Sequence, residues 1–294
     1  MSSHDFVIAL PADYPLSGFL AFHARDNQQI AERTGPDWLE KAFVWHGQPA
    51  WLQLAFRPGH IAVRFEGSLP DAAALRRRVA HMLGLDQPVA RFESCFAGHP
   101  QLGPLLARQR GLRIPQSATP FEALSWAITG QQISVVAALS LRRRMILAAG
   151  AVNEHGMPCY PDAKAVADLG EAALRACGFS TAKAACLAQL ATALASGGLV
   201  LPGSESSPDD IVFEGLLRGI RGIGPWTRQY TLLRGYAALD ASLHGDVAVR
   251  RGIEALRGET APVTPAQAEA WLAQFAPFRA LVAAHLWAAA SSAP

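Results

Sequence analysis

Short apolar runs rich in β-branched and aromatic residues predict three strands in the first ninety residues of the chain. They cover residues 6–10, 51–56 and 61–65. The last two runs are separated by Arg57-Pro58-Gly59-His60, and a Pro-Gly turn of this length is typical of a β-hairpin. An apolar pattern of helical period follows from about Pro70 to Leu83. We therefore expect an N-terminal α+β domain over residues 1–90.

The strand pattern ends near Phe92, and helical patterns rich in Ala and Leu continue to the end of the chain. Two of the expected helices begin with a capping box and a proline at the first helical position, Thr119-Pro120-Phe121-Glu122 and Thr264-Pro265-Ala266-Gln267. Ser207-Pro208-Asp209-Asp210 predicts a third helix start of a similar kind. The sequence thus predicts an all-α region over residues 91–294.

The composition is that of a folded protein, since half of the residues are apolar and 17% are charged. The 294 residues are enough for two or three compact units with their own cores. The cysteines show no C-x-x-C spacing, so neither a zinc site nor an iron–sulfur cluster is expected. The polar N-terminus leads into only a short apolar run, which predicts neither a signal peptide nor a membrane span. A reduced, cytoplasmic setting is the simplest expectation.

Positive charge is concentrated between Leu216 and Arg257, although the whole chain carries a net charge of only +2. This stretch holds seven arginines and three acidic residues, a net charge of +4, so the rest of the chain sums to −2. A basic face on a near-neutral protein favours a polyanion held at one surface. A set of solvated helix faces explains the same charges equally well.

A Gly-Ile-Gly turn within this basic stretch predicts a tight connection between two helices. In Gly222-Ile223-Gly224-Pro225 the glycines permit a backbone path that β-carbons would block. Pro225 is expected at the first position of the next helix, whose free N–H groups point outward and suit a phosphate. The flanking Leu217, Ile220 and Thr227 make the pattern more specific than a lone G-x-G.

One acidic residue, Asp246, follows the turn by about one helix. Its simplest interpretation is an N-cap, because an acid before Val247 satisfies free N–H groups of the helix expected there. Those N–H groups and the helix dipole also keep the carboxylate ionised. An ionised carboxylate can stabilise a developing cation or orient an attacking water, so cap and catalyst can be the same residue.

Trp226 and a pair of glutamines each have a structural and a functional interpretation. Trp226 follows the turn directly, where its indole can stack on a planar, positively charged base, whereas core burial is the default for most aromatic residues. Gln131 and Gln132 interrupt an otherwise apolar helical stretch. Such adjacent amides either form a buried polar network, which the residues alone favour, or probe a DNA groove.

Two segments of the chain resemble the helix-hairpin-helix DNA glycosylases. They are Pro120-Phe121-Glu122-Ala-Leu-x-x-Ala127-Ile128-x-x-Gln131-Gln132-Ile133-Ser134 and Leu217-x-x-Ile220-Arg221-Gly222-Ile223-Gly224-Pro225-Trp226-Thr227 through Gly245-Asp246. Within that superfamily the chain is most similar to the DNA-3-methyladenine glycosylase II group, which repairs alkylated DNA. The resemblance runs over nearly the whole chain. It implies an α+β fold in which a small N-terminal antiparallel-sheet α/β domain precedes a mostly α-helical, two-part core with the active-site cleft between the parts.

The resemblance also implies roles for individual residues. It makes Asp246 the catalytic aspartate and lines the base pocket with Trp226, Tyr230 and Phe278. The implied DNA contacts are Gln131, Gln132, Gly222, Gly224, Thr227 and Arg228. No cofactor is required, but the family's hairpin holds a monovalent cation, Na⁺ or K⁺, through backbone carbonyls that here belong to Arg218, Ile220 and Ile223. The expected partner is double-stranded DNA with damaged bases, bound by a monomer.

The positions of the lysines bear on the type of reaction. Family members that cut the DNA strand form a Schiff base with a lysine, but here Trp226 occupies the corresponding position and no lysine follows Lys183. The sequence therefore favours a monofunctional N-glycosylase that releases alkylated purines by hydrolysis, in base excision repair. The alternatives are a non-catalytic DNA-binding module and a glycosylase for oxidised or deaminated bases. His244-Gly245, Val247 and the polar Gln132 depart from the family pattern and bear on the range of lesions.

Overall fold

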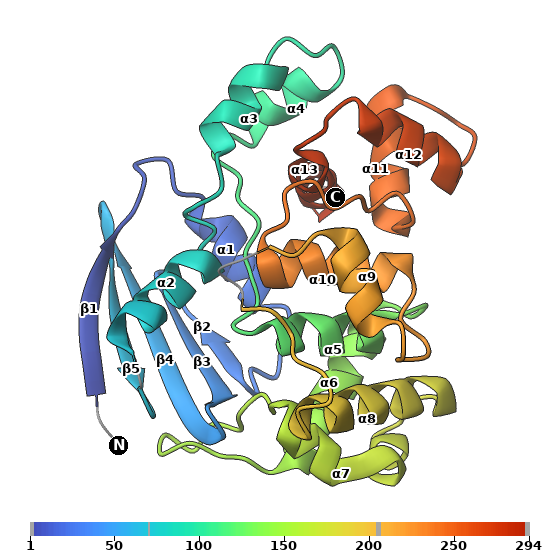
Figure 1. The fold of residues 1–294 in the computed structure, drawn as a ribbon. Helices are drawn as coiled ribbons and strands as arrows, with labels where there is room; N and C mark the ends of the chain where they lie inside the picture. Colours follow the sequence, from blue (N-terminus) through green and yellow to red (C-terminus); the bar gives the residue numbers. More distant parts are fainter. Residues whose placement is uncertain (1–2, 70, 204–206, 292–294) are drawn as a thin grey trace.

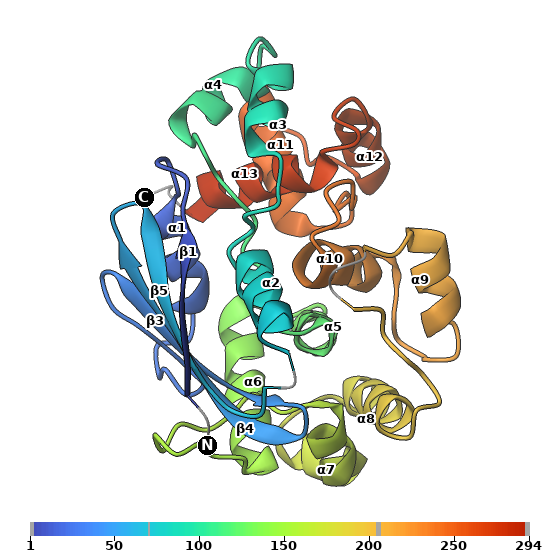
Figure 2. The same ribbon diagram turned by 60° about the vertical axis from the view of Figure 1, so that its left-hand side comes forward.

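The computed structural model describes residues 3–69, 71–203 and 207–291, and it confirms the predicted α+β fold class. The strands are β1 (Ser3–Ala9), β2 (Glu32–Thr34), β3 (Trp38–Trp45), β4 (Gln48–Arg57) and β5 (His60–Glu66). The helices are α1 (Leu16–His23), α2 (Ala72–Met82), α3 (Val89–Phe96), α4 (Leu102–Arg108), α5 (Pro120–Gly130), α6 (Val135–Ala149), α7 (Ala163–Ala176), α8 (Thr181–Ala195), α9 (Asp210–Leu217), α10 (Pro225–Tyr236), α11 (Val247–Arg257), α12 (Pro265–Ala273) and α13 (Arg279–Ser291). The sheet lies on one side of the molecule and most helices lie beyond it (Figure 1 and Figure 2).

The strands form one antiparallel sheet in the order β1-β5-β4-β3-β2. The predicted hairpin is confirmed, because Arg57 on β4 pairs with His60 on β5 across the Pro-Gly turn. Along β5 the side chains of Ile61, Val63 and Phe65 are buried and those between them are exposed. This alternation turns one face of the strand toward the core.

The sequence pattern did not predict α1, β2 or β3. In β3 the charged pair Glu40-Lys41 hides the apolar character of the strand. Lys41 is nevertheless fully buried, because its Nζ lies 2.6 Å from Glu32 Oε1 on β2 and 2.6 Å from Glu122 Oε1 on α5. A partner that is distant in the sequence thus permits a buried charge that local patterning excludes.

The predicted helix starts are confirmed to different extents. Thr264 forms a complete capping box. The Thr119 hydroxyl accepts the Glu122 N–H, but the Glu122 carboxylate is directed to other donors, so that box is only half formed. Helix α9 is capped by Asp209 and not by Ser207, because the Asp209 carboxylate accepts an N–H of the first turn.

The helices pack in two groups that we call the lower and the upper group. Helices α5 to α10 pack on one another and form the lower group, whereas α11 to α13 pack together with α3 and α4 and form the upper group (Figure 1). Phe92 on α3 contributes to the upper group through a ring contact with Phe278. Within the described ranges, no helix is long and apolar enough to span a membrane.

Candidate active site

The Gly-Ile-Gly turn connects α9 to α10, as predicted. Gly222 has a φ of +94°, and a β-carbon there would lie 3.3 Å from Cys186 on α8. Gly224 is different, because its backbone is extended and a β-carbon would meet no atom within 4 Å. The expectation that both glycines are sterically required is therefore wrong for Gly224.

The N-terminus of α10 has no side-chain cap. Gly224 is the N-cap residue, and Pro225 stands at the first helical position. The N–H groups of the first turn therefore have neither a capping hydroxyl nor a capping carboxylate, which makes this helix end suitable for an anion.

Asp246 is the N-cap of α11, and its carboxylate also accepts hydrogen bonds from two tryptophans. Oδ1 lies 3.0 Å from the Val249 N–H nitrogen and 3.2 Å from Trp287 Nε1. Oδ2 lies 2.9 Å from Trp226 Nε1. An N-cap needs only the first of these contacts. The two indoles come from α13 and α10, so the carboxylate lies where the upper and lower groups meet.

An aromatic cluster extends from Asp246 toward the sheet. Trp226 and Tyr230 share a face of α10, since they are one helical turn apart, and their ring centroids are 5.3 Å apart. Trp287 lies 6.1 Å from Tyr230, and Trp126 Nε1 on α5 donates to the Tyr230 hydroxyl at 2.9 Å. Trp126 and Trp287 were not predicted as site residues, because only the long-range packing of α5 and α13 brings them here.

Phe278 is placed in a different aromatic cluster. It is buried, and its ring contacts are with Phe92 and Phe96 of α3, at 5.7 and 6.5 Å. The structure therefore gives Phe278 a core role in the upper group, and Trp287 takes the position beside Tyr230 and Asp246.

Gln131 and Gln132 lie in the turn between α5 and α6 and not within one helix, which corrects the predicted helical stretch. Gln131 Nε2 donates to the Gly222 carbonyl at 2.8 Å and to the Thr227 hydroxyl at 2.9 Å. The polar-network interpretation thus fits Gln131, which ties this turn to the α9–α10 hairpin. Thr227 is buried, and its hydroxyl is used by the Gln131 amide, so this side chain is not available to a ligand. Gln132 is exposed, with a φ of +53°.

The arginines of the basic stretch are not all available at the surface. Arg234 is buried, and Arg228 lies 3.1 Å from Glu214 and 3.5 Å from Asp210 on α9. The remaining arginines of the stretch lie at the surface or are partly buried there. The expected DNA contact of Arg228 would therefore require exchange of its ion pairs.

The carbonyls of the hairpin are partly used within the protein. Those of Leu217, Gly219 and Gly222 accept hydrogen bonds, the last two from the side chains of Gln189 and Gln131. The cation ligands implied by the resemblance, the carbonyls of Arg218, Ile220 and Ile223, are different atoms of the same turn. In the described ranges, no cluster of His, Cys, Asp and Glu could hold a metal ion.

Family models match most of the chain. The model described as HhH-GPD superfamily base excision DNA repair protein matches residues 125–277, just over half of the 294 residues. The chain belongs to the HhH-GPD superfamily. A model of the AlkA N-terminal domain matches residues 7–119. The N-terminal sheet thus lies in a region that matches a described domain family of its own.

Individual members of the superfamily resemble the chain in sequence and in fold. It is 30% identical over 190 residues to DNA-3-methyladenine glycosylase 2 of Escherichia coli, an alignment that spans 63% of this chain and 63% of that protein. The 3-methyladenine DNA-glycosylase from Archaeoglobus fulgidus has the same fold, with a TM-score of 0.83, 22% identity and coverage of 96% and 97% of the two chains. The Schizosaccharomyces pombe 3-methyladenine DNA glycosylase in complex with abasic DNA has a TM-score of 0.60 and 25% identity, and the match covers 69% of this chain and 98% of that one.

Lys183 is the last lysine in the sequence. Lys183 on α8 donates from Nζ to the Thr129 carbonyl, 2.9 Å away, at the C-terminal end of α5. Partial burial lowers its pKa. The ammonium thus stabilises a helix C-terminus, where a positive charge is favourable.

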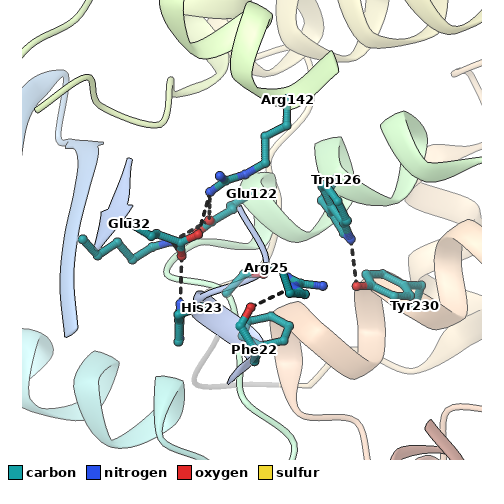
Figure 3. A pocket seen from close by; sticks show the side chains of 10 residues that line it. Phe22, His23, Arg25, Glu32, Glu122, Trp126, Arg142 and Tyr230 are labelled. Atoms are coloured by element: carbon teal, nitrogen blue, oxygen red, sulfur yellow. Dashed lines mark hydrogen bonds and ion pairs between the residues drawn. The ribbon is translucent and has the colours of Figure 1, made fainter. Parts of the chain in front are cut away.

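A cavity lies between the sheet domain and the lower helical group, at the end of the aromatic cluster. It is lined by Phe22, His23, Arg25, Glu32, Lys41, Ser117, Glu122, Trp126, Arg142 and Tyr230 (Figure 3). At its inner end Glu32 accepts from Lys41, from Arg142 at 3.0 Å and from His23 at 2.8 Å. Burial alone would raise the pKa of Glu32, but Lys41 and Arg142 hold it well below its ordinary value. The sheet domain thus contributes side chains to the same region as the aromatic cluster.

Proposed function

We propose that this chain is a monofunctional DNA N-glycosylase that releases alkylated purines from double-stranded DNA by hydrolysis of the N-glycosidic bond. The observation that carries the proposal is the environment of Asp246. Its two carboxylate oxygens accept three N–H groups, two of which come from indoles that an N-cap does not need. Such fixed donors keep a carboxylate ionised and hold its plane.

The proposed reaction begins with recognition of the lesion strand. The uncapped N-terminus of α10 binds a phosphate, and the damaged nucleotide is flipped out of the duplex at a cost of a few kcal/mol. Trp226 then stacks on the base, and Tyr230 lines the pocket beside it. An alkylated purine carries positive charge, which strengthens its interaction with an indole face.

Asp246 acts on the sugar. Its negative charge stabilises the oxocarbenium-like deoxyribose that forms as the base leaves, and it orients a water toward C1′. The alkylated purine leaves without a strong general acid because it is already cationic. The product is an abasic site.

The reaction stops at base release in this proposal. A strand-cutting lyase needs an amine nucleophile, and the side chain that hydrogen-bonds to Asp246 at this position is the indole of Trp226. Lys183, the last lysine of the chain, stabilises a helix end through the Thr129 carbonyl. Borohydride should therefore trap no covalent complex between the protein and DNA that carries an abasic site, and a trapped adduct would contradict the hydrolytic mechanism.

Release of methylated bases from duplex DNA separates an enzyme from a DNA-binding module. We expect methylated purines to appear as free bases when the protein is incubated with methylated duplex DNA. Tight binding without base release would favour the non-catalytic alternative. Release of oxidised bases only would favour a glycosylase of another class.

A monovalent cation at the hairpin is a further part of the proposal. The carbonyls of Arg218, Ile220 and Ile223 would hold Na⁺ or K⁺ and place positive charge beside the bound phosphate. Replacement of K⁺ by a large organic cation at constant ionic strength should weaken DNA binding if this site is used.

A further inference from the structure

The hydroxyl of Tyr230 has an unusual set of neighbours. Trp126 Nε1 lies 2.9 Å from it and links α5 to α10. An indole N–H is a donor only, so the direction of this hydrogen bond is fixed and the tyrosine oxygen accepts. The phenol proton must therefore point to another group.

Two arginines, which are also donors only, lie near this hydroxyl. Arg234 is 8% exposed, and its guanidinium lies over the rings of Phe22 and Trp287, at 4.4 and 5.2 Å. Burial lowers the pKa of Arg234 to about 10, and the neighbouring Tyr230 opposes this change. Arg25 lies over the Trp126 ring at 5.2 Å. Within the described part of the chain, no acceptor hydrogen-bonds to the phenol proton.

The hydroxyl end of Tyr230 faces the cavity (Figure 3). It points toward Arg25 and Phe22, which line the opposite side. A buried donor without an acceptor costs about 1–3 kcal/mol. The cavity has a volume of only about 20 Å³, so it accommodates a single acceptor atom of a ligand at this position and not a whole base.

We propose that Trp126 is a positioning residue that directs the Tyr230 hydroxyl proton onto the 6-oxo group of a flipped purine, so that the site favours 6-oxopurines over 6-aminopurines. This inference rests on the proposed function and names its preferred substrate class. 7-Methylguanine and hypoxanthine carry an acceptor oxygen at C6, whereas 3-methyladenine carries an amino group whose N–H would face another donor. A site built to pair with one polar group rejects an analogue that lacks it, because its own groups are left unpaired.

Methylated duplex DNA tests this inference directly, because it contains both 7-methylguanine and 3-methyladenine. Trp126→Phe keeps an aromatic ring and removes the N–H donor. We expect single-turnover release of 7-methylguanine to fall about tenfold, the effect of losing one hydrogen bond, while release of 3-methyladenine changes little. Tyr230→Phe should lower the ratio of released 7-methylguanine to 3-methyladenine by a similar factor, and the double variant should lower it no more than either single one, since both changes remove one interaction.

Trp271→Phe is the matched control. It removes another indole N–H, that of a residue on α12, which donates to Gln101 Oε1 at 3.3 Å. It should leave the ratio of the two released bases unchanged. An equal fall of both bases in Trp126→Phe, or additive effects of Trp126→Phe and Tyr230→Phe, would overturn the inference.

Calorimetric titration with free hypoxanthine and free adenine separates this inference from the proposed function. The wild-type protein should bind hypoxanthine more tightly, and Trp126→Phe should remove the difference. This preference without any release of bases from DNA would refute the proposed function and leave the inference standing. Equal affinity of the wild-type protein for the two bases would overturn the inference even if bases are released.

Discussion

Asp246 and Trp226 form the central pair of residues in the candidate site. The sequence predicted both, because a glycine turn, a following aromatic residue and a later acid are local features of one stretch. It did not predict Trp287 or Trp126. Each of these lies on a helix whose local pattern is simply apolar, and packing over a separation of 41 and 104 residues brings each to its partner.

Trp226→Phe tests whether the indole N–H positions the Asp246 carboxylate. The variant keeps an aromatic face for stacking but loses the 2.9 Å hydrogen bond to Oδ2. A hydrogen bond to a charged group contributes about 1.5–3 kcal/mol, so we expect single-turnover base release to fall by about ten- to a hundredfold. The thermal midpoint should change little, because Trp226 is only partly buried.

Trp271→Phe serves as the control for this change as well. It removes an indole hydrogen bond away from Asp246 and should leave base release unchanged. A Trp226→Phe variant with wild-type rates would mean that stacking alone explains the role of this residue.

Elements were predicted well where their signals are local. The β4–β5 hairpin and the helix starts at Thr119 and Thr264 follow from turn and cap residues within a few positions. Strand β3 was missed because Lys41 is neutralised by residues of other elements. The turn between α5 and α6 was missed because it depends on Gln131 binding to the hairpin.

Gly222→Ala and Gly224→Ala form a matched pair within the α9–α10 hairpin. At Gly222 the positive φ and the nearby Cys186 make a β-carbon costly, so we expect a loss of about 1–3 kcal/mol in the free energy of unfolding. At Gly224 a β-carbon meets open space, so stability should be nearly unchanged. There the added methyl group should instead weaken DNA binding, because it obstructs approach of a phosphate to the helix end.

Chemical denaturation and DNA titration of the two variants separate these effects. Equal destabilisation by both changes would contradict the structural difference between the glycines. Unchanged DNA binding by Gly224→Ala would contradict phosphate binding at this helix end.

At the scale of the whole molecule, buried histidines link folding stability to pH. Burial lowers the pKa of both His81 and His285 to about 4 from an ordinary value of 6.5. Between these pH values the unfolded chain binds more protons than the folded one, so stability falls as the pH falls from about 6.5 toward 4. We expect the thermal midpoint to be lower at pH 5 than at pH 7.

His81→Gln is the control for this dependence. It removes one of the titrating groups, so the thermal midpoint should change less steeply between pH 7 and pH 5 than in the wild-type protein. A midpoint that is constant or rises as the pH falls through this range would contradict the burial of neutral histidines.

The arrangement of the two helical groups could not be predicted from the sequence in detail. Local patterns give helices and their ends, but the position of Asp246 between the groups depends on how α11 packs on α13 and how α10 packs on α5. The same packing places Phe278 against Phe92 of α3 and brings the sheet-domain residue Phe22 into the cavity that Trp126 and Tyr230 line. The resemblance implied two parts and a site between them, and the structure supplies the residues that meet there.

The most direct test of the account is base release by Asp246→Asn. The amide oxygen can still cap α11, so the variant should fold with a thermal midpoint close to that of the wild-type protein and should bind DNA that contains an abasic site. Without the negative charge, single-turnover release of methylated purines from duplex DNA should fall by at least about 10²–10³-fold. Release at the wild-type rate by a folded Asp246→Asn protein would show that this carboxylate is only a helix cap, and it would contradict the proposed function of the site.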